Sequence, residues 1–305
     1  MFFTIQTIAR HEFLALRKQK TFTLLLCVFL VMTLFSTYIG WSTRHTILSI
    51  YDETVKQMAA GGITEIPVNP FLAAPALSVL KNMVVYVLLI GTLLSIIVGH
   101  SAFARERRAG VVKILFSKPF SRTVFVLGKM AGILFVLALV MAASFIISLL
   151  SVSLISSRLL SMAETFRLFV FYGVSLEYVL GFAMLGFLFS ITAKSESLAL
   201  LIPVMIWVLI NFVMPQLSSA LDPASLLNPT SIRAVLPQSH FFTTIRTVIA
   251  PVSISESYKL MGQTLLESDN YVFPVWSSII FLVILVACCV HAIKKFNVCE
   301  KEITE

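Results

Sequence analysis

The sequence predicts an all-α integral membrane protein. We expect six transmembrane helices, an N-terminal amphipathic helix at the membrane interface and a small extracytoplasmic segment between helices 5 and 6. Hydrophobic residues make up 58% of the 305 residues and charged residues only 12%, whereas soluble domains are roughly 45–50% apolar. Six stretches of about 18 or more residues are almost uncharged, and in lipid only a helix satisfies such a backbone internally.

The six predicted transmembrane helices cover residues 21–40, 83–102, 124–157, 167–192, 198–217 and 274–293. The third exceeds the ~20 residues that a bilayer needs, so we expect it to tilt or to project beyond the lipid. The first is followed by no small-x-small cleavage site, so we expect an anchor and not a cleaved signal. The predicted divisions are the interfacial helix in 1–20, helices 1–5 in 21–217 with a loop at 103–123, the extracytoplasmic segment in 218–273, and helix 6 with the tail in 274–305.

Residues 2–16 repeat with a helical period that separates an apolar face from a polar one. The apolar face holds Phe2, Ile5, Ala9, Phe13 and Leu16, and the polar face holds Gln6, Arg10, His11 and Arg17. Such a helix can lie in the inner interface with its basic side toward lipid headgroups. The alternative is that these residues only extend the first transmembrane helix into the cytoplasm.

The connection between helices 1 and 2 is predicted to be irregular, because Pro67, Pro70 and Pro75 forbid a single helix through it. Within 218–273, the stretch "SESYKLMGQTLLES" predicts an amphipathic helix, with Ser253 or Ser255 as its cap. The same segment contains an aromatic pair that is a candidate contact for an extracytoplasmic partner protein. The pair is Phe241 and Phe242.

Lys and Arg are distributed unevenly along the chain. With the N-terminus inside, the inner segments carry fifteen of these residues and the outer segments eight, although the outer segments are longer in total. Positive residues favour the cytoplasmic side, so both termini are expected there. We therefore expect a multi-pass protein of the bacterial cytoplasmic (inner) membrane.

Enzyme signatures are incomplete in this sequence. His11 and Glu12 begin an H-E-x-x-H zinc signature, but the second histidine is missing. Gly128 and Lys129 resemble the end of a phosphate loop, but the required Ser or Thr does not follow them. We expect a non-catalytic membrane subunit that binds no metal or cofactor itself.

Two polar residues within the predicted helices are candidates for a translocation path, because such groups are costly in lipid. Glu177 lies in helix 4, either near mid-depth or in its outer third, and Asn211 lies in helix 5 between two prolines. The alternative for Glu177 is a pairing residue near the outer interface. The alternative for Asn211 is a hydrogen bond between helices.

The stretch "ARERRAGVVKILFSKPFSRTVFVLGK", residues 104–129, concentrates positive charge between two apolar helices. It holds seven bases, Arg105, Arg107, Arg108, Lys113, Lys118, Arg122 and Lys129, against the single acid Glu106. A short helix can form there until Pro119 stops it. From composition alone, the stretch could equally be an anchor loop bound to anionic lipid.

The order of residues in this stretch resembles the first cytoplasmic loop of type-2 ABC exporter permeases, the ABC-2 family. The matching positions are Glu106, Gly110, Leu115, Ser117, Pro119 and Arg122, followed by Gly128 and Lys129. The resemblance extends to the N-terminal helix with Glu12, to the six helices and to the long segment before helix 6. Among members, the chain looks most like short unfused permeases such as the nitrous-oxide reductase maturation transporter permease. It departs from the pattern at Val111, where Thr is usual, and at Arg107 and Arg108, where many members carry an acid.

The resemblance implies that the loop forms a coupling helix docking into a separate ABC ATPase subunit. The residues implied in this contact are Glu106, Gly110, Leu115, Phe116, Ser117, Pro119 and Arg122. It also implies two ATPase copies, which bind ATP and Mg, and a second permease copy making a homodimer, with no nucleic acid involved. The expected function is then the permease subunit of an ATP-driven exporter. The alternative is a scaffold that passes ATPase-driven motion to an extracytoplasmic partner without moving a solute.

Overall fold

The computed structural model describes residues 2–62, 75–108, 122–215 and 253–267, together with single positions between 244 and 294. Within these ranges every regular element is a helix. The elements are α1 (Phe2–Arg17), α2 (Lys20–Ala60), η1 (Ala76–Leu80), α3 (Lys81–Tyr86), η2 (Val87–Gly91), α4 (Thr92–Arg108), α6 (Arg122–Ser156), α7 (Met162–Thr192), α8 (Glu196–Val208), η3 (Leu209–Val213) and α12 (Ile254–Glu267).

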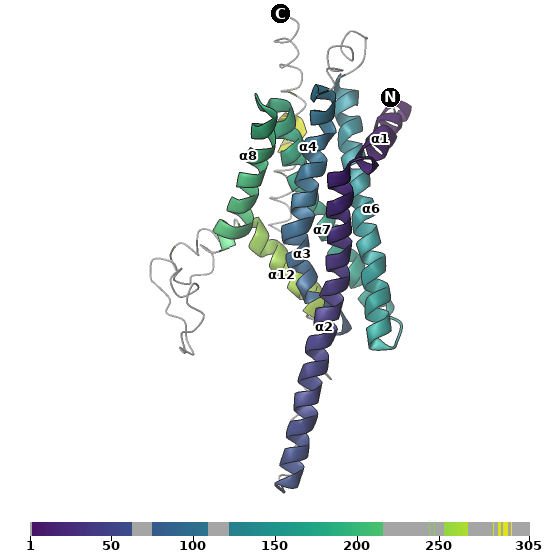
Figure 1. The fold of residues 1–305 in the computed structure, drawn as a ribbon, viewed down its shortest axis with the longest axis vertical. Helices are drawn as coiled ribbons and strands as arrows, with labels where there is room; N and C mark the ends of the chain where they lie inside the picture. The colour runs from purple at the N-terminus through teal and green to yellow at the C-terminus, as the bar shows by residue number, and fades with distance from the viewer. Residues whose placement is uncertain are drawn as a thin grey trace, which may run out of the picture.

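Five helical stretches are long and apolar enough to cross a membrane. They are Lys20–Ala60, Ala76–Arg107, Thr123–Ser156, Met162–Thr192 and Glu196–Val213. They coincide with the first five predicted transmembrane helices, so the chain is a multi-pass, all-α membrane protein. Most of the sixth predicted helix, 274–293, lies outside the described residues. The bundle has a loop end, where α4 stops and α6 starts, and an opposite far end (Figure 1).

Helix α2 is much longer than the predicted first transmembrane helix. Its 41 residues span about 60 Å, against a hydrocarbon core of ~30 Å, and its last turns project from the far end of the bundle (Figure 1). The prediction of an irregular connection was therefore wrong for residues 41–60. The predicted helix breakers begin only at Pro67, and α2 instead ends at Gly61 and Gly62, where Gly62 adopts a positive φ of 75°.

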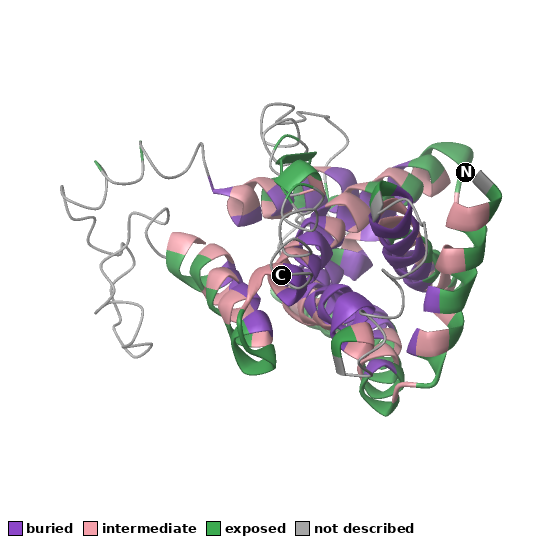
Figure 2. Cartoon of the chain, turned by 90° about the horizontal axis from the view of Figure 1, so that it is seen from above, coloured by how far each residue is buried: buried purple, intermediate pink, exposed green. Residues whose placement is uncertain are grey.

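Helices α4 and α7 pack backbone against backbone at the centre of the bundle. A Cβ atom added at Gly99 would lie 1.9 Å from the carbonyl oxygen of Ala183, and one added at Gly186 would lie 2.4 Å from that of Ile96. Glycines permit this approach because no side chain separates the helices. Figure 2 shows that the buried residues gather in the middle of the helix bundle. The two helices therefore have little freedom to slide past each other.

Two π-helical turns occur toward the far end, one in each of two neighbouring transmembrane helices. Turn η2 precedes α4, and turn η3 follows α8. A hydrogen bond joins the two helices beside these turns, because Trp207 Nε1 donates to Thr92 Oγ1 at 2.7 Å. π-Helical turns are rare and mark places where a helix can kink.

A helix forms where the sequence predicts one in the segment before helix 6. Ser253 Oγ accepts a hydrogen bond from the backbone N–H of Glu256, so Ser253 acts as its N-terminal cap. The helix, α12, packs into the bundle: the Tyr258 ring stacks on Tyr178 with centroids 4.3 Å apart, and its hydroxyl lies 2.8 Å from Ser175 Oγ. Its last turn accepts a hydrogen bond at Leu265 O from the buried Arg167.

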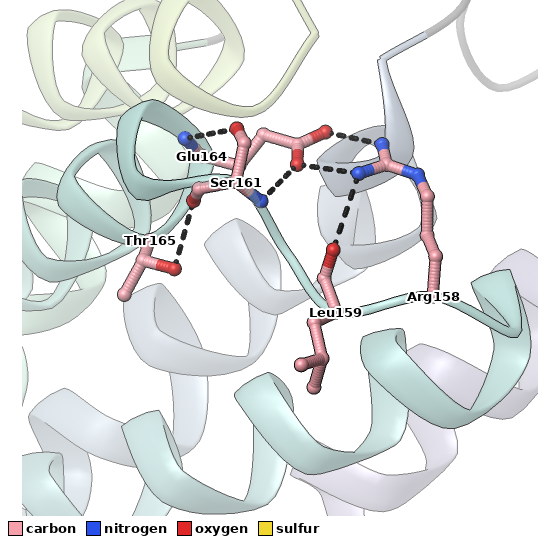
Figure 3. A network of polar contacts seen from close by, with 5 residues as sticks. All are labelled: Arg158, Leu159, Ser161, Glu164 and Thr165. Atoms are coloured by element: carbon pink, nitrogen blue, oxygen red, sulfur yellow. Dashed lines mark hydrogen bonds and ion pairs between the residues drawn. The ribbon is translucent and has the colours of Figure 1, made fainter.

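The turn between α6 and α7 at the far end is closed by a capping box (Figure 3). The Ser161 hydroxyl accepts from the Glu164 N–H, and the Glu164 carboxylate accepts from the Ser161 N–H. Arg158 donates two hydrogen bonds to the same carboxylate, and this raises the pKa of Arg158 above its ordinary value. These contacts fix where α7 begins.

The contact between α4 and α7 gives a test with a matched control. Gly99→Ala is expected to destabilise the protein by about 1–3 kcal/mol or more, because the new methyl group overlaps a backbone oxygen. Gly173→Ala adds the same group to α7 at a position with no atom within 4 Å, so it should change stability by less than about 1 kcal/mol. Thermal unfolding of the purified proteins in detergent measures both. Equal melting temperatures would contradict the close packing.

Candidate functional site

Four charged side chains meet at the loop end and form a network that we call the ionic clasp: Glu12, Arg105, Glu106 and Lys129. Lys129 Nζ lies 2.5 Å from Glu12 Oε2 and also binds Glu106 Oε1. Arg105 binds the other carboxylate oxygen of Glu12. The residues come from α1, α4 and α6, and each ion pair joins two different helices.

The ionic clasp is withdrawn from water. The Glu12 side chain is fully buried and the Lys129 side chain is 2% exposed. The side chains of Arg105 and Glu106 are 20% and 16% exposed. Two acids and two bases leave no net charge, and Lys129 also lies 5.6 Å from the centre of the Phe125 ring. Buried charges are tolerated only when they are paired in this way, so removing one member should leave its partners destabilised.

Helix α1 reaches the ionic clasp because α6 presents two glycines to it. A Cβ atom added at Gly128 would lie 2.9 Å from the Ile8 side chain, and one added at Gly132 would lie 2.8 Å from Glu12 Cβ. The Gly-x-x-x-Gly spacing in α6 thus serves a contact within the chain. One turn further along, Phe13 packs edge-on against Phe135, with ring centroids 5.8 Å apart.

Arg107 connects the same end of α4 to the α7–α8 turn. Its guanidinium donates to the carbonyl oxygens of Ala193 and Lys194, at 2.7 and 3.0 Å. These carbonyls lie at the C-terminal end of α7, where a cation is favoured by the helix dipole. The basic residue that departs from the family pattern therefore has a structural role here.

The predicted contact residues fall in two groups. Glu106 belongs to the ionic clasp, and Arg122 is the first residue of α6. The others lie outside the described residues, and so does the aromatic pair proposed for a partner contact: Gly110, Leu115, Phe116, Ser117, Pro119, Phe241 and Phe242. The ionic clasp therefore describes the base of the predicted coupling loop, where it joins α4 and α6.

The two candidates for a translocation path have different surroundings. Asn211 in η3 is 4% exposed, and its Oδ1 accepts a hydrogen bond from the Tyr178 hydroxyl at 2.6 Å. Glu177 is half-buried in α7, and its Oε1 accepts no hydrogen bond from the described residues. Glu177 lies about 22 Å along α7 from Thr192 at the loop end and equally far from Met162 at the far end, so it sits at the middle of the helix.

Sequence reasoning missed the pairing that makes the ionic clasp. Glu12 drew notice as part of an incomplete zinc signature and Lys129 as part of an incomplete phosphate loop. A signal was available, since both charges stand next to apolar helical faces and need a partner there. Within the described residues, no group of three or more His, Cys, Asp or Glu side chains could hold a metal ion. The ion pairs of the ionic clasp join helices α1, α4 and α6.

Comparison with known protein families matches nearly the whole chain. The family model described as "ABC-2 family transporter protein" matches residues 6–297, nearly the whole chain. No curated protein matches. The matched range includes every member of the ionic clasp and both helices that carry the loop.

The ionic clasp predicts a non-additive pair of substitutions. Lys129→Met leaves two buried carboxylates facing one arginine, so we expect it to destabilise the protein by about 3–5 kcal/mol. Adding Glu12→Gln restores neutrality, since Arg105 and Glu106 remain, and the double variant should be more stable than the sum of the single effects predicts, by about 0.5–3 kcal/mol. Thermal unfolding of all three variants tests this. Strict additivity would contradict the network. The control is the pair Arg158 and Glu164, in which the arginine side chain is 51% exposed.

Proposed function

Because the chain belongs to the ABC-2 family of transporter proteins, we propose that it is one of two identical permease halves of an exporter. Membership of this family makes the chain a membrane component of an ABC transporter, which works with an ABC ATPase. The ATPase subunits would bind and hydrolyse ATP with Mg. This chain would convert their movement into a change of the membrane helices. The ionic clasp carries the proposal, since it ties both ends of the predicted coupling loop to the bundle.

The connections at the loop end support a direct mechanical path. A force on residues 109–121 acts on the end of α4 and the start of α6, which Glu106 and Lys129 hold together. Glu12 adds α1 to the same unit, and Arg107 adds the α7–α8 turn. Rigid-body movements of this kind commonly transmit a conformational change through a packed helix bundle.

The proposed orientation places the loop end in the cytoplasm of a bacterium, at the inner membrane. The excess of Lys and Arg at this end supports it. The far end, with the projecting part of α2, would then face the extracytoplasmic side. Glu177 then lies near the middle of its helix, between the two sides of the membrane.

Two copies of the permease are supported by the large apolar surface that one copy leaves uncovered. Helices α2 and α8 are the least buried of the five candidate spans. On α8 and the following turn η3, exposed apolar side chains form one stripe: Leu198, Leu201, Met205, Leu209 and Phe212. A second permease copy or lipid can cover this stripe. The proposed path runs between copies beside α4 and α8, where η2 and η3 allow bending and where Asn211 lies.

A scaffold that acts on an extracytoplasmic protein is the second candidate function, and the length of α2 favours it. Residues 41–60 continue the helix by about 30 Å, and exposed apolar side chains occur along them at Trp41, Ile47 and Ile50. A partner could bind there and at Phe241 and Phe242. The narrower similarity to the nitrous-oxide reductase maturation permease stays a prediction.

Docking of the ATPase can be tested at the loop without disturbing the ionic clasp. Leu115→Asp places a charge on the predicted apolar face of the coupling helix, so the ATPase should no longer co-purify with the tagged permease. Co-purification is followed by mass spectrometry and ATP hydrolysis. Leu159→Asp makes the same change at a side chain that is 87% exposed at the far end, and it should leave the complex intact. Glu106→Lys is less informative, because it also breaks the ion pair with Lys129.

A Leu115→Asp variant that keeps its ATPase would overturn the coupling role of the loop. Loss of the ATPase in both variants would indicate a general folding defect. The scaffold function would be favoured by two results together. The ATPase would co-purify with the wild-type permease, and an extracytoplasmic protein would be lost when Phe241 and Phe242 are changed.

The orientation is tested by labelling single cysteines in a variant that lacks the four native ones. Ser117→Cys should react with a membrane-impermeant maleimide only from the cytoplasmic side. Ala60→Cys, at the exposed end of α2, should react only from outside. Reversed labelling of the two positions would invert the proposed topology.

A further inference from the structure

Helix α1 sorts its charges between its two faces. Glu12, the single acid among residues 2–20, points into the ionic clasp and is fully buried. The bases of the same stretch are all exposed: Arg10, Arg17, Lys18 and Lys20. All the exposed charges of α1 are therefore positive, because its single acid is buried.

The exposed face also contains apolar side chains in register with the bases. Phe3, Thr7, Arg10, Leu14 and Arg17 lie at spacings of three and four residues and form one stripe. Phe3 is 80% exposed and Leu14 is 45% exposed. Figure 2 shows α1 along one side of the bundle, with exposed residues on its outer edge. Alternating apolar and basic groups suit a boundary between acyl chains and negative charge.

The position of α1 along α6 places this stripe at the membrane surface. The part of α6 from Lys129 to Ser156 is about 40 Å long. A bilayer has a hydrocarbon core of ~30 Å and measures ~40–45 Å with its headgroups. Because α1 contacts α6 at Gly128 and Gly132, it lies at the level of the headgroups at the loop end.

From this geometry we infer that the outer stripe of α1 binds anionic phospholipid headgroups. Arg10 and Arg17 contact the phosphates, and Phe3 and Leu14 enter the adjacent acyl layer. Anionic lipid is favoured over a protein partner because the exposed bases are interspersed with apolar groups at headgroup depth. Since Glu12 fixes the other face of α1 to Lys129 and Arg105, a lipid held here also stabilises the base of the loop.

The test measures which lipids the full-length protein retains. The chain is reconstituted in nanodiscs of equal parts phosphatidylcholine and phosphatidylglycerol, and native mass spectrometry then counts the lipids that stay bound. Wild type should retain phosphatidylglycerol preferentially. Arg10→Gln with Arg17→Gln should lower this preference roughly 10- to 30-fold, because each base near the membrane surface contributes about a fivefold effect. Arg10→Lys with Arg17→Lys should keep most of it.

The matched control removes two exposed bases at the other end of the molecule. Lys56→Gln with Lys81→Gln changes the net charge by the same amount and should leave the preference unchanged. An equal loss in the control, or an unchanged preference in Arg10→Gln with Arg17→Gln, would overturn the assignment. Unchanged lipid retention together with loss of a co-purifying ATPase would assign the stripe to that subunit instead. Lipid retention is measured without the ATPase, so it is independent of the coupling role tested at Leu115.

Discussion

The buried ammonium group of Lys129 constrains the whole loop end. An isolated cation there would be strongly disfavoured, so α6 can keep this side chain only if carboxylates from other helices neutralise it. Glu106 supplies one from α4 and Glu12 supplies the other from α1. The amphipathic helix is therefore held to the bundle by charge pairing as well as by apolar contact. The angle between α1 and α6 is thus set by these ion pairs together with the close contacts at Gly128 and Gly132.

The ionic clasp is connected to the membrane-embedded part of the bundle through the contact between α4 and α7. Helix α4 carries two of the four charges at its end, and its middle touches the α7 backbone at Gly99 and Gly186. Arg107 joins the same two helices again at the loop end. A displacement of the loop cannot be absorbed by sliding between α4 and α7, so it must move them together.

The sequence was sufficient for the features that depend on one segment alone. Apolar length predicted the five described spans, and a capping serine predicted α12. It failed where the cause lies elsewhere in the chain. Glu12 and Lys129 are 117 residues apart, and no local pattern pairs them. The extension of α2 was missed for a different reason: the prolines after residue 66 predict an irregular connection, although a proline limits a helix only near its own position.

Rigidity and flexibility are distributed unequally along the bundle, and this decides where movement can occur. Near the loop end, ion pairs and glycine contacts hold α1, α4, α6 and α7 in one unit. Toward the far end, the spans that contain α4 and α8 include the π-helical turns η2 and η3, and a hydrogen bond between Trp207 and Thr92 joins these two spans. A helix bends most easily at such turns. Movement that enters at the loop should therefore shift the loop end as one unit and appear as bending toward the far end, beside Asn211 and α12.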